Sequence, residues 1–145
     1  MAAEMPRLRE GALDVAHFLA DAPSAGDGAE VLFSGTVRNL HEGRAVTAIR
    51  YHAHAALAEQ RLREIETEGA AKFNVTLRVA HAVGLLHVGD SSVVVLARSG
   101  HRGETFEAAR WAIDTIKCAV PVWKEEHYAD GSVVFQDGVP IETIA

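Results

Sequence analysis

The chain has 145 residues, of which 48% are hydrophobic and 23% are charged. This composition is that of an ordinary globular protein, and it excludes the disordered and collagen-like classes. We expect a single domain over residues 1–145 that buries its core without disulfides or a structural metal.

Charge and cysteine content exclude further classes of protein. The net charge of −6 argues against a general nucleic-acid binder, because neutralising phosphates requires a basic surface. A membrane-spanning helix needs about 20 apolar residues, and no apolar run in the chain is nearly that long. Residues 1–10 carry mixed charges and no apolar core, which is not the pattern of a signal peptide. The single cysteine, Cys118, excludes an intrachain disulfide and a cysteine-cluster metal site. We therefore expect a cytoplasmic protein without nucleic-acid or membrane partners.

The first third of the chain predicts a short helix and two strands. Residues 12–20 carry apolar side chains at helical spacing, and the segment 21–28, which contains glycine and proline, ends this pattern. Residues 30–37 and 45–51 are β-branched and aromatic runs that predict strands. The polar segment 38–44 between them predicts a mobile loop.

Two longer helices and two more strands follow. Residues 55–73 and 104–118 place apolar side chains on one face at helical spacing. Residues 75–83 alternate apolar and polar side chains, and residues 91–97 form a nearly continuous apolar run after a turn at Gly89. Both segments are therefore expected to be strands.

The C-terminal region predicts a closing hairpin. Pro121 ends the second long helix, and residues 122–128 and 132–135 predict strands, with a turn at residues 136–138. The order β-β-α-β-β-α-β predicts an α+β fold in which two long helices pack on a mainly antiparallel sheet.

Positive charge gathers in the C-terminal half despite the acidic total. The segment SGHRG at residues 99–103 lies between a buried strand and a helix start, where unpaired backbone N–H groups and the helix dipole favour an anion. The alternative is an ordinary strand-to-helix turn with two exposed polar residues, and the spacing favours neither. The basic side chains of this region are Arg98, His101, Arg102, Arg110, Lys117 and Lys124.

Two of these residues are candidate catalytic groups. Lys117 lies at the edge of the apolar stripe of its helix, and Lys124 follows Pro121 on the next strand, so both amines could face one pocket. A partly desolvated lysine near another cation has a lowered pKa and can act as a base or nucleophile. The alternative is a pair of solvated surface lysines, with Lys117 paired to Asp114, and the residues alone favour this one.

Other candidate residues have simpler interpretations. Cys118 is more typical of a small buried hydrophobe than of a thiol nucleophile. His52 and His54 share one face of a strand, but no third metal ligand is evident, so we expect no metal site. Arg38 either reaches into a cleft or stays solvated. The aromatic side chains that we assign to the core or to an interface are Phe33, Trp111 and Trp123.

Three segments form a specific combination: FSGTVRN at residues 33–39, SGHRGETF at residues 99–106, and IKCAVPVWKE at residues 116–125. Together they resemble the MoaE family, the large, catalytic subunits of molybdopterin synthase. Each segment is weak alone, but their order and spacing cover roughly residues 10–128. The resemblance implies an α/β hammerhead fold with an additional antiparallel β subdomain.

The resemblance also implies an activity and partners. Members of this family form a homodimer that joins two copies of a small ubiquitin-like subunit, which ends in Gly-Gly and carries sulfur as a C-terminal thiocarboxylate. This tail enters a pocket of the large subunit, where cyclic pyranopterin monophosphate receives two sulfurs and becomes the dithiolene molybdopterin. No metal or redox cofactor is required. At matching positions, Lys117 and Lys124 would be catalytic, and Arg38, His101 and Arg102 would bind the phosphate-bearing pterin.

The leading hypothesis is thus a sulfurtransferase that acts only with its small partner. The alternative is a non-catalytic relative that binds a ubiquitin-like tail or a phosphorylated pterin without turnover. The presence of both lysines favours catalysis over this binding module. A third hypothesis, an unrelated lysine-dependent enzyme acting on a phosphorylated metabolite, predicts activity without a protein partner.

Overall fold

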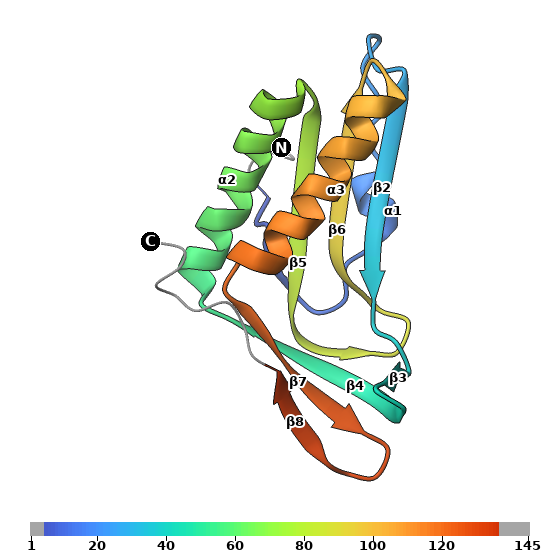
Figure 1. Ribbon diagram of the computed structural model, residues 1–145, viewed down its shortest axis with the longest axis vertical. Coiled ribbons are helices and arrows are strands. Elements are labelled where there is room, and N and C mark those ends of the chain that lie inside the picture. Colours follow the sequence, from blue (N-terminus) through green and yellow to red (C-terminus); the bar gives the residue numbers. More distant parts are fainter. Residues whose placement is uncertain (1–4, 137–145) are drawn as a thin grey trace.

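A computed structural model describes residues 5–136 of the chain, and the arrangement of its elements is shown in Figure 1. The long helices predicted from the sequence are both confirmed, and a short helix precedes them. The helices are α1 (Val15–Phe18), α2 (Ala55–Phe73) and α3 (Arg102–Ala119). The strands are β1 (Leu8–Glu10), β2 (Ala29–Thr36), β3 (Leu40–His41), β4 (Arg44–Ala53), β5 (Thr76–His87), β6 (Ser91–Ser99), β7 (Val122–Tyr128) and β8 (Val133–Gln136).

The strands form one mainly antiparallel sheet, as the sequence predicts. Within residues 5–136 the hydrogen-bonded order is β2-β6-β5-β4-β7-β8, with β3 beside β4. The short strand β1 is a parallel addition to β5 that the sequence analysis did not predict. The strands β3, β4, β7 and β8 make up the additional antiparallel region at the lower end of the molecule in Figure 1.

The long strand β5 connects the two parts of the sheet by changing its partner. Its first half, from Thr76 to His81, pairs with β6, whereas Gly84 to His87 pair with β4. Gly84 has a φ of +91°, a conformation that glycine adopts without the steric cost of a side chain. The strand can therefore bend at this point, where its partner changes from β6 to β4.

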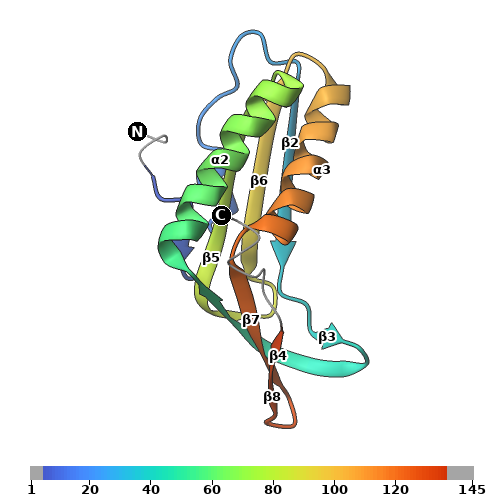
Figure 2. The ribbon, with the colours of Figure 1, turned by 60° about the vertical axis from the view of Figure 1, so that its left-hand side comes forward.

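The two long helices cover one face of the sheet and leave the other to a separate cluster (Figure 2). The fully buried strand β6 serves both sides, because its side chains alternate between the faces. Val93, Val95 and Ala97 pack among the helices, and Val94 and Leu96 pack on the opposite side. Burial on both faces explains why this segment reads as a nearly continuous apolar run.

One turn differs from the sequence prediction, and the closing hairpin agrees with it. The segment expected to be a loop at residues 38–44 contains a tight hairpin, in which β3 pairs with β4 and both Glu42 and Gly43 have positive φ. This conformation is that of a two-residue hairpin turn, which matches the twist of the strands. The closing hairpin is formed by β7 and β8, with Gly131 in its turn. Residues 137 and 138 of the predicted final turn lie outside the described residues.

Tight packing between α2, α3 and β5 generates a prediction at Gly69. A methyl group there would lie 2.5 Å from Leu77 Cδ2 and 2.8 Å from Trp111 Cζ3. We expect Gly69→Ala to lower the free energy of unfolding by about 1–3 kcal/mol, although alanine favours helices, because the core must shift to admit the methyl. Urea unfolding measures this change. Gly103→Ala is the matched control, because no atom lies within 4 Å of its added methyl, and equal stability of the two variants would contradict the packing argument.

Candidate active site

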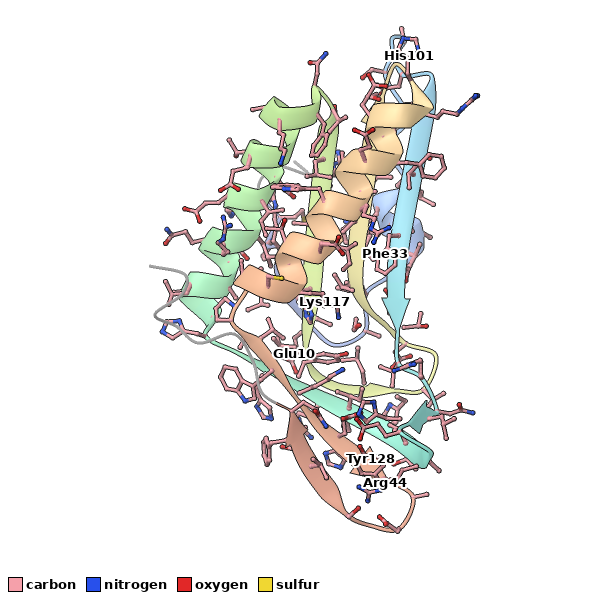
Figure 3. The ribbon with its side chains drawn as sticks, viewed as in Figure 1. Glu10, Phe33, Arg44, His101, Lys117 and Tyr128 are labelled. Atoms are coloured by element: carbon pink, nitrogen blue, oxygen red, sulfur yellow. The ribbon has the colours of Figure 1, made fainter. Side chains whose placement is uncertain are left out.

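The link between α3 and β7 fixes the two candidate lysines. The helix ends at Ala119, and the backbone N–H of Val120 still donates to the carbonyl of Ile116. Pro121 is buried, and its carbonyl accepts a hydrogen bond from the N–H of His54 at 3.1 Å. The chain therefore turns directly from helix to strand, and Lys117 lies at the C-terminal end of α3, close to β5 and β7 (Figure 3).

Lys117 and Lys124 line the same two hollows, which we call the apolar lobe and the polar lobe. The sequence analysis proposed that both amines could face one pocket. The apolar lobe has a volume of about 150 Å³, and its walls include Ile116, Val120, Val122 and Trp123. The polar lobe has a volume of about 170 Å³, and its walls include Arg38, His41, Ser92 and Glu126. Both lysines and Tyr51 line both lobes. The two amines therefore stand at the boundary between an apolar and a polar compartment.

Lys117 combines solvent access with an electrostatically unfavourable position. Lys117 as a whole keeps surface accessible to solvent, but its side chain lines the cavity. Partial burial lowers the pKa of Lys117, and the nearby cation of Lys124 lowers it further. A larger fraction of the amine is then neutral at physiological pH than in a solvated lysine, so the group can act as a base or nucleophile. Asp114 does not offset this effect, because it pairs with Arg110 instead.

Glu126 places a carboxylate in the polar lobe, a feature that the sequence analysis missed. The residue is only 2% exposed, and its Oε1 has no hydrogen-bond partner within residues 5–136. The Nε2 of His41 lies 3.8 Å from this oxygen. The sequence feature that could have indicated Glu126 is its two-residue spacing from Lys124, because residues two apart on a strand face the same side. The polar lobe therefore offers both cations and an acceptor to a ligand.

His81 and Tyr51 are two further cavity residues that the sequence analysis missed. His81 is 4% exposed and lines the apolar lobe, and its ring meets that of Tyr51 edge to face at 5.2 Å between centroids. Burial lowers the pKa of His81 to about 4, with smaller effects from the cations of Lys117 and Lys124, so the imidazole is neutral at physiological pH. Burial also raises the pKa of Tyr51. The sequence signal for His81 is its two-residue spacing from the buried Val79 on β5.

The structure separates the predicted anion-binding residues within one chain. Arg38 lines the polar lobe, but His101 and Arg102 lie at the opposite end of α3 (Figure 3). The helix places His101 about 24 Å along its axis from Lys117. The hydroxyl of Ser99 donates to the carbonyl of His101, so this serine braces the turn. The two side chains themselves remain exposed.

Cys118, His52 and His54 are the remaining candidates for a thiol or metal site. The expectation that Cys118 is buried is wrong, because the residue is exposed on α3. His54 accepts the N–H of Leu57 at the start of α2, whereas His52 contacts Glu125 at 3.2 Å. Residues 5–136 contain no group of three or more His, Cys, Asp or Glu side chains able to hold a metal ion.

The predicted aromatic residues have three different surroundings. Trp111 is half-buried and packs against the core between the helices and the sheet. Trp123 forms a cavity wall and stacks on His52, and Phe33 is 39% exposed on β2. Trp111 is therefore the core aromatic of the three.

The crowding of the two amines generates a prediction about titration. We expect Lys124→Met to raise the pKa of Lys117, because it removes a neighbouring positive charge, and to leave it below that of a solvated lysine, because burial remains. The measurement is the pH dependence of amine acetylation at Lys117, followed by mass spectrometry, with the exposed Lys72 as internal control. A pKa of Lys117 that stays constant or falls in the variant would contradict the shared cavity.

Comparisons with known proteins identify relatives of this chain. The sequence profile of the MoaE protein family matches residues 8–119. The molybdopterin synthase catalytic subunit of Oryza sativa subsp. indica is 41% identical over 124 residues, which cover 85% of this chain but only 64% of that protein. The catalytic subunit of Thermoplasma volcanium is 42% identical over 106 residues, covering 72% of this chain and 77% of that protein.

A solved structure is also similar over nearly the whole chain. The crystal structure of molybdopterin synthase from Staphylococcus aureus superimposes with a TM-score of 0.84 at 27% sequence identity, covering 91% of this chain and 96% of that chain. This likeness confirms the α+β fold with its mainly antiparallel sheet. The family match spans most of the chain and includes Lys117, Arg38 and the end of α3. The chain belongs to the MoaE family.

Proposed function

We propose that the chain is the catalytic subunit of a molybdopterin synthase, which transfers two sulfurs from the thiocarboxylated tail of a small ubiquitin-like subunit to cyclic pyranopterin monophosphate. The observation that carries this proposal is the position of two amines at the boundary between an apolar and a polar lobe. Catalytic subunits with this activity are 41% and 42% identical to the chain. The reaction takes place in the cytoplasm, where a reducing compartment suits an exposed thiol such as Cys118.

The apolar lobe is suited to the tail of the small partner. A tail that ends in Gly-Gly has no bulky side chains near its terminus, so it can enter a narrow space lined by Ile116, Val120 and Trp123. Its terminal carbonyl then reaches the lysines. The thiocarboxylate is an anion, and two nearby ammonium groups favour its approach.

The polar lobe is suited to the phosphorylated pterin. Arg38 offers a guanidinium for the phosphate, and Glu126 and Ser92 offer hydrogen-bonding groups for the polar heterocycle. The lysines between the lobes then contact both reactants. This arrangement favours a reaction between two bound molecules over simple storage of one.

The two lysines have complementary roles in the proposed transfer. The sulfur of the tail bonds to a carbon of the precursor, and the bond from that carbon to oxygen breaks, so that the oxygen leaves with its electron pair. The acyl–sulfur bond then breaks as water adds to the carbonyl. The sulfur stays on the substrate, and the tail leaves as a carboxylate. Lys117, with its lowered pKa, acts as a base or nucleophile toward this carbonyl, and Lys124 stabilises the negative charge that develops on its oxygen.

His101 and Arg102 require a second copy to take part in substrate binding. They are too far from Lys117 along α3 to reach the same cavity. In a homodimer, the start of α3 from one copy can approach the cavity of the other, where its exposed basic side chains add to the phosphate site. We assign both residues to substrate binding only in this dimeric form.

The main test measures sulfur transfer by variants with substitutions at the C-terminal end of α3. We expect Lys117→Ala to lower formation of the dithiolene pterin by at least a hundredfold, because the reactive amine is removed, and Cys118→Ala to keep near wild-type activity. The assay contains the thiocarboxylated small subunit and the cyclic pterin precursor, with a control lacking the small subunit. A folded, fully active Lys117→Ala would overturn the role of this lysine. Product formed without the partner would favour the independent enzyme.

The alternative of a binding module is tested with the same reagents. A module would bind the tail or the pterin tightly and form no product in the wild-type chain. The crowded lysines argue against it, because binding alone does not require an amine with a lowered pKa.

The assignment of Arg102 gives a separate prediction. We expect Arg102→Ala to weaken binding of the pterin precursor by about tenfold and to leave binding of the small subunit nearly unchanged. Isothermal titration calorimetry measures both affinities. Arg110→Ala is the matched control, because Arg110 is an exposed arginine on the same helix. Equal losses for the two ligands would contradict a phosphate-binding role.

A further inference from the structure

The proposed reaction leaves His81, a buried titratable group of the cavity, without a task. His81 lies on β5 in the apolar lobe, where hydrophobic side chains from α3 and β7 lie beside the polar groups of Tyr51 and the two lysines. Within residues 5–136 the buried side-chain atom without a hydrogen-bond partner is Glu126 Oε1, so neither ring nitrogen of His81 is both buried and unpaired, and the ring can meet a ligand through the lobe. The residue is 4% exposed, and its position is fixed by packing against Tyr51.

The hydrogen bonds of His81 define which ring nitrogen is free. A carbonyl oxygen can only accept, and Nδ1 lies 2.7 Å from the carbonyl oxygen of Ala82, so Nδ1 carries the proton. In the neutral ring Nε2 is then an acceptor. Within residues 5–136 Nε2 has no hydrogen-bond partner, although Lys117 and Lys124 line the same lobe. The imidazole therefore presents one fixed lone pair to the cavity.

This acceptor matches a requirement of the tail that the apolar lobe is proposed to bind. An extended peptide that leaves water carries backbone N–H groups, and each needs an acceptor. The aliphatic walls and Trp123 offer none, and protonated lysines only donate, so His81 and the hydroxyl of Tyr51 are the side chains of the lobe that can accept. We propose that Nε2 of His81 accepts a hydrogen bond from one of the two amide N–H groups of the Gly-Gly tail and thereby sets the register of its terminal carbonyl against Lys117. This inference rests on the proposed function, because it deepens the account of the same site.

A role as proton acceptor for Lys117 fits the observations less well. With a pKa of about 4, the imidazole is a much weaker base than the lysine amine and does not take its proton. The same low pKa keeps Nε2 unprotonated throughout the pH range in which the enzyme is expected to work. His81 is thus a positioning residue that recognises an N–H donor.

The experiment combines a variant with a chemically altered tail. The probe is a synthetic peptide that ends in Gly-Gly, together with two analogues in which one or the other glycine nitrogen carries a methyl group and cannot donate. The variant is His81→Asn, which keeps a donor near the position of Nδ1 and lacks an atom at the position of Nε2. His87→Asn is the matched control, because His87 is exposed on the same strand outside the lobe. Calorimetry gives the affinities of each protein for each peptide.

For the wild type and for His87→Asn, we expect methylation of one of the two nitrogens to weaken binding by about fivefold to tenfold more than it does for His81→Asn. This difference isolates the hydrogen bond from the steric effect of the methyl group, which all proteins share. An equal effect of methylation on all three proteins would overturn the role of His81 and leave the tail pocket intact. Failure of the wild type to bind the unmodified peptide would remove the tail pocket and this inference with it.

A second measurement does not depend on the folding of any variant. Nitrogen-15 spectra of the histidine side chains in the wild-type chain report whether Nε2 of His81 gains a hydrogen bond. We expect its resonance to shift when the Gly-Gly peptide is added, and to shift less with the analogue that lacks the recognised N–H. An unchanged resonance at saturating peptide would contradict the proposal.

Discussion

The site depends on one electrostatic constraint, the placement of two ammonium groups against a single cavity. The buried Pro121 fixes the path of the chain between Lys117 and Lys124, and its carbonyl is held by the backbone of His54. The backbone positions of the two lysines therefore cannot move apart without disturbing the junction of α3, β4 and β7. Partial desolvation, and to a smaller degree the charge of Lys124, lower the pKa of Lys117, so more of this amine is neutral than in a solvated lysine.

The surrounding fold gives this amine pair two different compartments. The bend of β5 at Gly84 joins the helix-covered part of the sheet to the region of β4 and β7, and the lobes lie where these parts meet. Hydrocarbon walls and His81 suit a peptide tail, whereas Arg38 and Glu126 suit a polar anion. None of the helices within residues 5–136 has the length and apolar character that crossing a bilayer requires.

The sequence predicted the elements whose patterns are long and missed those whose patterns are short. The boundaries of α2 agree with the periodicity of residues 55–73, whereas β1 and β3 contain too few residues to show any period. The resemblance led to Lys117 and Lys124, because the segment 116–125 carries both. Three-dimensional placement was harder to predict: Cys118 is exposed rather than buried, and His101 and Arg102 lie far from Arg38 within one chain. His81 and Glu126 escaped notice because their importance arises from burial, which a single sequence does not reveal.

The most direct test of the account is a crystal structure of the chain with a bound peptide that ends in Gly-Gly. The account predicts that the tail occupies the apolar lobe and that its terminal carboxylate lies between the amines of Lys117 and Lys124. A tail bound elsewhere, or a carboxylate bound at the start of α3 beside His101 of the same chain, would contradict the central claim that the two lysines form the meeting point of the reactants.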